Sequence, residues 1–260
     1  MDLNLTGRTA LVTGASKGIG RAIARQLALE GCHVHMAART AADLEAARPA
    51  VLQGGPVQVW VHALDVGAPG AAHALAEACG PVDILVNNAG AIPPGNLQQV
   101  DEARWRQAWD LKVFGYINLA RAVYARMRDR GRGVIINIIG SAGERLDSDY
   151  VAGSTGNAGL MAFTRALGGT SLRDGIRVVG INPGPIATER HVMLSRHKAQ
   201  ARWGDAERWR ELYEPLPAKR AGTPDEIAAL TAFLASDRSA YTTGCIVTVD
   251  GGLSASTVPY

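Results

Sequence analysis

The chain alternates short runs rich in Val and Ile with longer stretches of helical periodicity, and this alternation limits its possible folds more than any other feature. The runs that we predict as strands read "TALVTG", "HVHMA", "VQVWVHAL", "DILVNNAG", "GVIINIIG", "IRVVGINPG" and "CIVTVDGG". Helical stretches lie between them, the longest over residues 101–130. Strands that alternate with helices build right-handed crossover units and a parallel sheet. We therefore predict an α/β fold in which helices cover both faces of a doubly wound parallel sheet.

Composition fits one globular domain over residues 1–260. The 260 residues are 47% hydrophobic and 20% charged, and we find no linker or repeat that divides them. A chain of this length can bury a sizeable core in a single domain. The formal net charge of +3 and the dispersed Lys and Arg residues predict no nucleic-acid partner. No apolar run approaches the about 18 residues of a membrane span, so we expect no membrane association.

The cysteines and the N-terminal sequence favour the cytoplasm. Cys32, Cys79 and Cys245 are scattered, odd in number and without metal-ligand spacing. This pattern predicts reduced and mostly buried thiols and no metal site. The first residues, "MDLNLTGRTALV", lack the charged-then-apolar build of a signal peptide. We expect a cytoplasmic protein.

A glycine-rich segment, "TGASKGIG", follows the first predicted strand and opens the first predicted helix. Gly14 permits the turn, Gly18 lets a pyrophosphate approach the backbone, and Gly20 lets the helix pack against the strand. The helix N-terminus offers free N–H groups and a positive dipole to the phosphate. The motif alone is also compatible with a glycine-rich turn that binds nothing.

Further motifs give the segment a family context. They read "LDV" at 64–66, "NNAG" at 87–90, "NPGPIAT" at 182–188, "GTPDEIA" at 222–228 and "VDGG" at 249–252. With "TGASKGIG", and in this order and spacing, they show that the chain resembles the short-chain dehydrogenase/reductase family over essentially its full length. The resemblance implies a Rossmann-type sheet of seven strands that binds NAD(P)(H).

The resemblance also implies where the cofactor lies. Asp65 and Val66 would flank the adenine, "NNAG" would line the ribose side, and "NPGPIAT" would hold the nicotinamide end. The cofactor residues that we expect are Gly14, Ser16, Lys17, Gly18, Ile19, Gly20, Arg39, Asp65, Val66, Asn88, Ala89, Gly90, Pro183, Gly184, Ile186 and Thr188.

Charge favours NADP(H) over NAD(H). An acidic residue at the end of the second strand would bind the ribose hydroxyls and repel a 2′-phosphate. Here that position holds Ala38, followed by Arg39, and Lys17 lies in the glycine-rich segment. Two cations and no carboxylate predict NADP(H), the alternative being two solvated surface cations.

The family's catalytic Asn, Ser, Tyr and Lys have no counterparts at the expected positions. Registered against neighbouring motifs, these positions hold Lys112, Gly140, Gly153 and Asn157. Lys and Asn have thus exchanged places. Ser141 lies one residue from the Ser position, and a tyrosine lies three residues before Gly153. The cofactor half of the site therefore matches the family, and the catalytic half departs from it.

We hypothesise that Tyr150 donates the proton and that Lys112 replaces the missing lysine, because a neighbouring cation lowers a phenol pKa. The glycines at 153, 156 and 159 would leave space for the ring. Ser141, Ser154 and Thr155 are alternative donors, and Ser154 also fits a helix cap.

Three functions stay open at this point. The first is an NADP(H)-dependent oxidoreductase with a rebuilt proton relay. The second is an NADP(H)-binding protein without redox turnover, such as a sensor or an inactive subunit. The third is a non-redox enzyme on the same scaffold, since function depends on the site and not on the fold.

Residues 188–220 form a segment that in the family folds over the substrate as a lid. It holds eight Lys/Arg and five Asp/Glu, and also Trp203 and Trp209. A basic lid would favour an anionic substrate, such as a carboxylate or a phosphate-bearing thioester. A solvated amphipathic helix is the alternative. The resemblance further implies a homotetramer, or a homodimer, paired through helices near 101–130 and 154–172.

Overall fold

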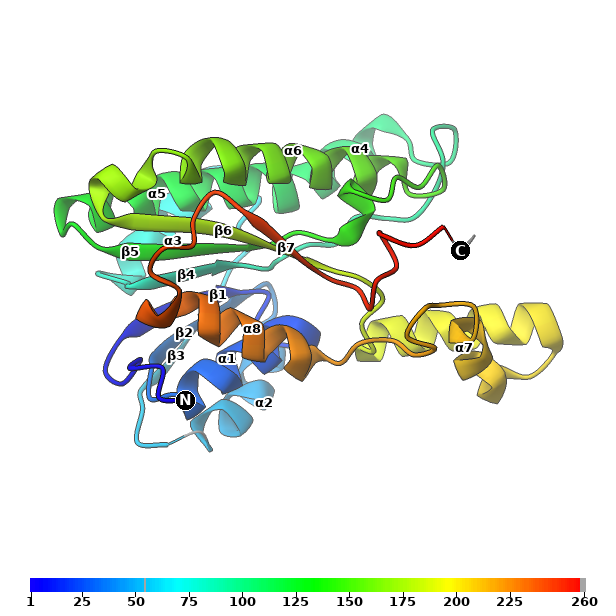
Figure 1. Ribbon diagram of the computed structural model, residues 1–260, viewed down its shortest axis with the longest axis horizontal. Helices are drawn as coiled ribbons and strands as arrows, with labels where there is room; N and C mark the ends of the chain where they lie inside the picture. Colours follow the sequence, from blue (N-terminus) through cyan, green and yellow to red (C-terminus); the bar gives the residue numbers. More distant parts are fainter. Residues whose placement is uncertain (54, 258–260) are drawn as a thin grey trace.

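The computed structural model describes residues 1–53 and 55–257. Within these residues, seven parallel strands form one sheet in the order β3-β2-β1-β4-β5-β6-β7 (Figure 1). The strands are β1 Thr9–Thr13, β2 His33–Ala38, β3 Val59–Ala63, β4 Ile84–Asn87, β5 Gly133–Ile138, β6 Ile176–Pro183 and β7 Ile246–Val249. The predicted doubly wound α/β sheet and its seven strands are confirmed.

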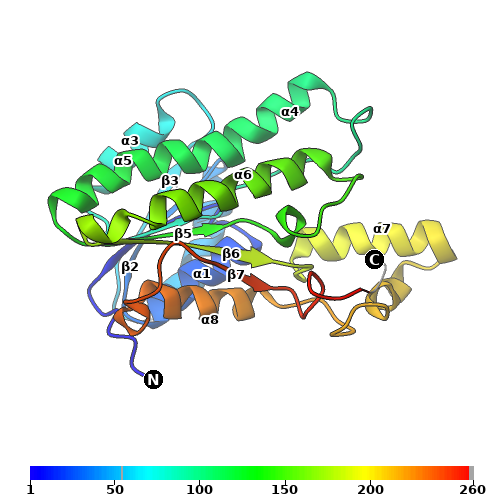
Figure 2. The ribbon, with the colours of Figure 1, turned by 45° about the horizontal axis from the view of Figure 1, so that its top comes forward.

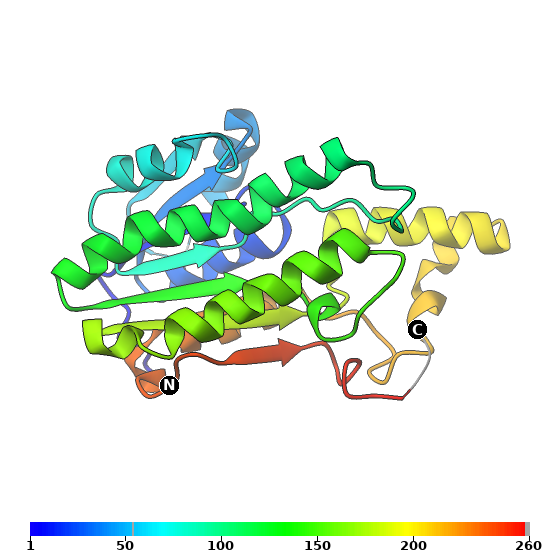
Figure 3. The same ribbon diagram turned by 90° about the horizontal axis from the view of Figure 1, so that it is seen from above.

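Helices cover both faces of the sheet in two layers (Figure 1). One layer consists of α1 Gly18–Leu29, α2 Ala41–Leu52 and α8 Pro224–Ala235. The other consists of α3 Ala71–Cys79, α4 Glu102–Trp109, α5 Gly115–Asp129 and α6 Val151–Gly168. Seen from above, α5 and α6 run side by side across the strands (Figure 3). Each layer packs its apolar side chains on one face of β1, β4 and β5, so the sheet is buried on both faces.

The strand order reverses between β1 and β4, and this reversal opens a crevice at the carboxyl ends of the strands. The hydroxyl of Thr13, the last residue of β1, accepts the N–H groups of Asn88 and Ala89 at 2.9 and 3.0 Å. The two strand ends that border the crevice are thereby held together.

The predicted long helix over residues 101–130 is present, with an interruption. Asp101 caps α4 by accepting the Arg104 N–H at 2.8 Å. A π-helical turn, η1 Asp110–Phe114, then joins α4 to α5, which continues in nearly the same direction (Figure 2). Lys112 lies in the middle of this turn. Single π-helical turns inside α-helices occur often at functional sites.

Residues 188–220 are more regular than the sequence suggested. They form α7 Glu189–Trp203 and a 3₁₀ helix, η4 Ala206–Tyr213, which project from the carboxyl end of the sheet (Figure 1). An apolar cluster around Trp209, Tyr213 and Leu216 holds α7 and η4 together. The other 3₁₀ helices are η2 Ser141–Gly143, η3 Ser171–Asp174 and η5 Asp237–Ser239.

The N-termini of α8 and α6 are capped differently. Thr223 and Glu226 form a complete capping box at the start of α8. Ser154 is no cap, because α6 already begins at Val151 and its N-cap residue is Tyr150.

No helix in the described part of the chain is long and apolar enough to cross a membrane.

Candidate active site

A cavity of about 230 Å³ lies at the carboxyl end of β1, where a dinucleotide is expected. Its lining residues come from the glycine-rich loop and from the ends of β2, β3 and β4: Thr13, Gly14, Ser16, Lys17, Ala37, Ala38, Arg39, Thr40, Asp43, Leu64, Val66, Ala89, Gly90, Ala91 and Leu111. Three of the sequence motifs, "TGASKGIG", "LDV" and "NNAG", thus contribute residues to one cavity.

The loop needs its glycines for steric reasons. A Cβ at Gly20 would lie 2.2 Å from the Gly14 carbonyl oxygen and 2.5 Å from the Asn88 side-chain nitrogen. Gly14 and Gly18 have φ angles of 64° and 54°, which disfavour any L side chain. Gly18 also faces the Thr188 methyl group, since a Cβ there would lie 3.0 Å from it. This bare backbone at the start of α1 fits a pyrophosphate.

Charge at the adenosine end is less one-sided than the sequence suggested. Lys17 pairs with the Asp43 carboxylate of α2 at 2.9 Å, and both line the cavity beside Arg39. The position at the end of β2 holds Ala38, as predicted, but the first turn of α2 adds a carboxylate that the sequence argument did not count. Arg39 remains as the cation at the end of β2. Asp65 accepts the Gly67 N–H and faces an adjoining cavity that Arg39 also lines.

The nicotinamide end is held against the loop by the start of α7. Thr188 caps this helix by accepting the His191 N–H at 3.2 Å. Arg21 of α1 pairs with Glu189 at 3.0 Å. Gly184 abuts Asp250, since a Cβ there would lie 2.5 Å from the Asp250 Cβ. Ile186 forms a parallel bridge with Gly222, so the "NPGPIAT" segment also contacts the start of the "GTPDEIA" motif.

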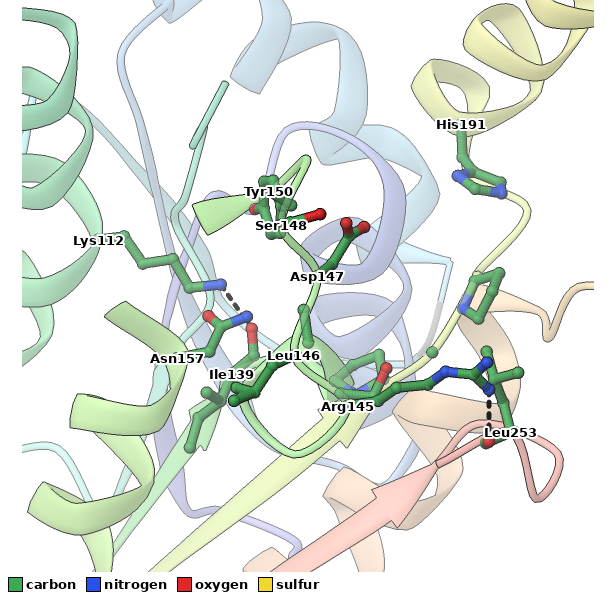
Figure 4. A pocket seen from close by; sticks show the side chains of 16 residues that line it. Lys112, Ile139, Arg145, Leu146, Asp147, Ser148, Tyr150, Asn157, His191 and Leu253 are labelled. Atoms are coloured by element: carbon green, nitrogen blue, oxygen red, sulfur yellow. Dashed lines mark hydrogen bonds between the residues drawn. The ribbon is translucent and has the colours of Figure 1, made fainter. Parts of the chain in front are cut away.

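A second cavity, of about 580 Å³, contains all three predicted catalytic residues (Figure 4). Lys112 comes from η1, Ser141 from the turn after β5, and Tyr150 from the residue before α6. Asn157 of α6 lies beside Lys112. The other two candidate hydroxyls make local bonds instead: Ser154 accepts the Asp147 N–H, and Thr155 donates to the Val151 carbonyl.

Lys112 links the two cavities. Its aliphatic chain lies over Gly90, because a Cβ at that glycine would be 2.9 Å from the Lys112 Cδ. Its ammonium donates to the Ile139 carbonyl at the end of β5, at 2.5 Å. Although the side chain keeps some exposure to the cavity, burial lowers its pKa to about 8. The lysine is therefore positioned between the cofactor cleft and the second cavity.

The Tyr150 ring occupies the place of a side chain at position 153. A Cβ at Gly153 would lie 2.0 Å from Tyr150 Cε1 and 2.2 Å from Cζ. The ring packs with Ile92, Ala108 and Ala152. Of the three glycines expected to make room for the Tyr150 ring, Gly153 is the one that the ring contacts. Gly159 faces open space.

The expected effect of Lys112 on Tyr150 is not seen. Burial raises the pKa of the Tyr150 hydroxyl, and the cation that opposes this shift is Arg190 of α7. The prediction that Lys112 lowers this pKa is therefore wrong. A tyrosine with a raised pKa stays protonated at neutral pH and can donate a hydrogen bond or a proton.

The family's serine position is closed by backbone geometry. Gly140 has a φ angle of 137°, a region that L residues rarely adopt, and a Cβ there would lie 2.9 Å from the Asn157 side-chain nitrogen. Asn157 is 2% exposed, and its Oδ1 has no hydrogen-bond partner among the described residues. The amide of Asn157 thus takes the space in which a serine side chain would stand, and Ser141 opens the next turn.

Two further residues of the cavity were not predicted. His191 faces it from the opposite wall, on α7, and burial lowers the pKa of its imidazole (Figure 4). Arg145 follows η2 and donates to the Leu253 carbonyl at 2.9 Å. Both come from segments without motif or periodicity, so only the folded chain brings them to the site.

Comparisons with known proteins show the family of the chain. A family model described as enoyl-(acyl carrier protein) reductase matches residues 14–254. The chain belongs to the short-chain dehydrogenase/reductase family. Its relatives are dehydrogenases and reductases, and the protein is accordingly an NAD(P)-dependent oxidoreductase.

Among these relatives, the galactitol 2-dehydrogenase (L-tagatose-forming) of Cereibacter sphaeroides is 36% identical over 251 residues, covering 95% of each chain. The 2-keto-3-deoxy-L-fuconate dehydrogenase of Xanthomonas campestris pv. campestris is 34% identical over 256 residues, covering 97% of this chain and 82% of the relative. The L-sorbose reductase of Gluconobacter frateurii, solved with NADPH and L-sorbose, has a TM-score of 0.93 and 32% identity, covering 98% of this chain and 100% of that one.

The place of the Tyr150 ring yields a prediction on stability. Gly159→Ala adds a methyl group to open space on α6, so we expect the free energy of unfolding to rise by up to about 1 kcal/mol from helix propensity. Gly153→Ala gains the same propensity but must displace the ring, and overpacking costs about 1–3 kcal/mol. Denaturant unfolding of both variants tests this. Equal stabilisation by both would mean that the ring does not lie on Gly153.

Proposed function

We propose that the protein is an NADP(H)-dependent oxidoreductase that interconverts a carbonyl and an alcohol on a small, polar, anionic substrate. Tyr150 and Lys112 act in place of the family's Tyr and Lys. The observation that carries this proposal is the Tyr150 ring on Gly153, in the same cavity as the ammonium of Lys112. Ser141 is the third catalytic residue of the proposal.

Each residue has a distinct role. The bound cofactor supplies or accepts the hydride. Tyr150, protonated at neutral pH, donates its proton to the developing alkoxide and recovers it from solvent. Lys112, over Gly90, would hold the cofactor's ribose and contribute positive charge near the reacting oxygen. The Ser141 hydroxyl and the Asn157 amide orient the substrate carbonyl.

Charge around the cavity supports an anionic substrate. Arg145 and Lys112 line it, and Arg190 is close enough to influence Tyr150, whereas Asp147 supplies the one carboxylate among the described lining residues. The Xanthomonas relative is named for a keto acid, and the Gluconobacter structure contains a ketose. A hydroxylated keto acid combines both features and is our substrate class; a thioester remains in the panel to be tested.

We further propose a cytoplasmic homotetramer or homodimer, as the family resemblance implies. A groove of about 830 Å³ along α4 supports the association of subunits. It is lined by the apolar side chains of Leu97, Trp105, Trp109 and Phe114, and those of Leu97 and Phe114 are exposed. Residues 188–220 serve as the lid of the proposed site, with His191 at its base.

We expect Tyr150→Phe and Lys112→Met each to lower kcat at least 100-fold while NADPH affinity changes little for the tyrosine variant, because proton transfer contributes about 10²–10⁴-fold. Steady-state NADPH oxidation against keto acids and ketoses gives the rates. Tyr241→Phe, at a residue 99% exposed, is the matched control. Wild-type rates in both site variants would contradict the roles, whereas NADPH binding without turnover on any substrate would favour a sensor or a non-redox enzyme.

The lowered pKa of Lys112 predicts an alkaline limit of activity. Its ammonium is lost as pH rises through about 8, whereas a solvated lysine keeps its charge to about pH 10.4. Since kcat/KM reports groups of the free enzyme, its pH profile should fall above about pH 8. The residual activity of Lys112→Met should lack this limb. A limb that persists unchanged in that variant would assign the titration to another group.

Cofactor preference should depend on Arg39. We expect NADPH to bind at least tenfold more tightly than NADH, a difference of roughly 1.4 kcal/mol, and Arg39→Ala to remove most of that difference. Nicotinamide fluorescence titrations measure both dissociation constants. Arg25→Ala is the control, because Arg25 is an exposed arginine of α1 that pairs with Asp225. Equal affinities for the two cofactors in the wild-type protein would refute the preference.

A further inference from the structure

Three potential metal ligands meet outside both cavities, on the face of the sheet that α3 covers. The His35 Nδ1 atom lies 2.9 Å from the His62 Nε2 atom, and the Cys79 Sγ atom lies 3.7 Å from the same nitrogen. All three ligand atoms fall within 4.8 Å of one another. None of these residues lines the cofactor cleft or the proposed reaction cavity.

The fold brings together residues that no linear motif connects. In the parallel pairing of β2 and β3, Ala37 is opposite His62, so His35 and His62 point to the same side of the sheet. Cys79 is the last residue of α3, which packs on that side. The cysteines have no metal-ligand spacing along the sequence, as noted above. The fold nevertheless places Cys79 beside two histidines.

We propose that His35 Nδ1, His62 Nε2 and Cys79 Sγ bind a Zn²⁺-class ion, with a water molecule as the fourth ligand. Tetrahedral zinc with Zn–N near 2.0–2.1 Å and Zn–S near 2.3 Å requires ligand separations of about 3.3 Å for N to N and about 3.6 Å for N to S. The two distances to His62 Nε2 differ from these by a few tenths of an ångström, and the His35 Nδ1 and Cys79 Sγ atoms lie within 4.8 Å of each other. Rotation of an imidazole, which breaks the hydrogen bond between the histidines, would let the three ligand atoms converge on the ion.

The surroundings suit imidazole and thiolate ligands. Burial lowers the pKa of both histidines, that of His35 to about 4, so both rings are neutral at pH 7. His35 stacks on Trp60 with ring centroids 4.3 Å apart, and this contact fixes the ring plane. Thiolate and imidazole together select zinc and copper(I) over magnesium and calcium.

Binding requires the S–H bond of Cys79 to break. The Cys79 thiol must lose its proton, which burial opposes and the nearby Arg126 favours. The proton leaves to solvent as the Zn–S bond forms, and no electrons are transferred. His62 is half-buried, so the ion can reach the site from the edge of the sheet. Once bound, the ion would connect edge strand β3 to β2 and to the end of α3.

Metal titration of the full-length, chelator-treated protein tests the proposal. We expect one Zn²⁺ per chain by calorimetry, with release of one proton, and one Co²⁺ per chain with thiolate-to-cobalt charge-transfer absorption. At a free zinc concentration 100-fold above Kd, the melting temperature should rise by roughly 5–10 °C. NADPH binding should not change.

Variants decide whether the three residues are the ligands. Cys79→Ser should lose the charge-transfer band and at least 100-fold in affinity, and His62→Asn should weaken binding at least tenfold. Cys32→Ser, which removes a different buried thiol, and His73→Gln, which removes an exposed imidazole of α3, should bind like wild type. NADPH binding shows that each variant is folded.

Two results would overturn the proposal. One is wild-type protein without stoichiometric binding, or with cobalt spectra that lack sulfur charge transfer. The other is affinity that Cys79→Ser and His62→Asn leave unchanged, which would assign the ion to surface groups. Because none of these readouts involves redox turnover, failure here leaves the proposed oxidoreductase function intact, and failure of that function leaves this site intact.

Discussion

The close contact between the glycine-rich loop and the end of β4 is the constraint on which the rest of the site depends. The Asn88 side-chain amide donates to the Thr13 carbonyl at 2.9 Å, and the Thr13 hydroxyl accepts the Asn88 N–H that follows β4. A Cβ at Gly20 would collide with the Asn88 side chain. The start of α1 is thereby held beside the strand that leads to Gly90. The contact thus holds the phosphate loop beside Gly90, the residue over which the Lys112 chain lies.

In the catalytic half, each substituted side chain lies against a glycine. The Tyr150 ring covers Gly153, the Asn157 amide lies against Gly140, and the Lys112 chain crosses Gly90. The family's hydroxyl, amide and ammonium groups are all present in one cavity, but they come from other positions of the chain. Such paired exchange of large and small residues conserves volume, which packed interiors require. We interpret the site as rebuilt rather than lost.

Sequence reasoning predicted the features that local residue patterns determine. It missed those that depend on where side chains point and on how strands pair in the folded chain. Apolar runs and the loop glycines are local, so the seven strands were confirmed, and residues of the predicted glycine-rich loop line one cavity. The carboxylate of Asp43 beside Lys17 depends on side-chain direction, and the π-helical turn at Lys112 is a local change of backbone hydrogen bonding that the residue pattern did not reveal. The meeting of His35, His62 and Cys79 depends on strand register, which a single sequence does not reveal.

The structure of the protein with bound NADP⁺ tests the central claim most directly. The account predicts the Lys112 ammonium within about 3 Å of a ribose hydroxyl, and the Tyr150 hydroxyl within hydrogen-bond reach of the substrate side of the nicotinamide, directly or through one water. A Tyr150 hydroxyl more than about 8 Å from both the nicotinamide C4 atom and the Lys112 Nζ atom would contradict it, since direct proton transfer needs contact or one bridging water.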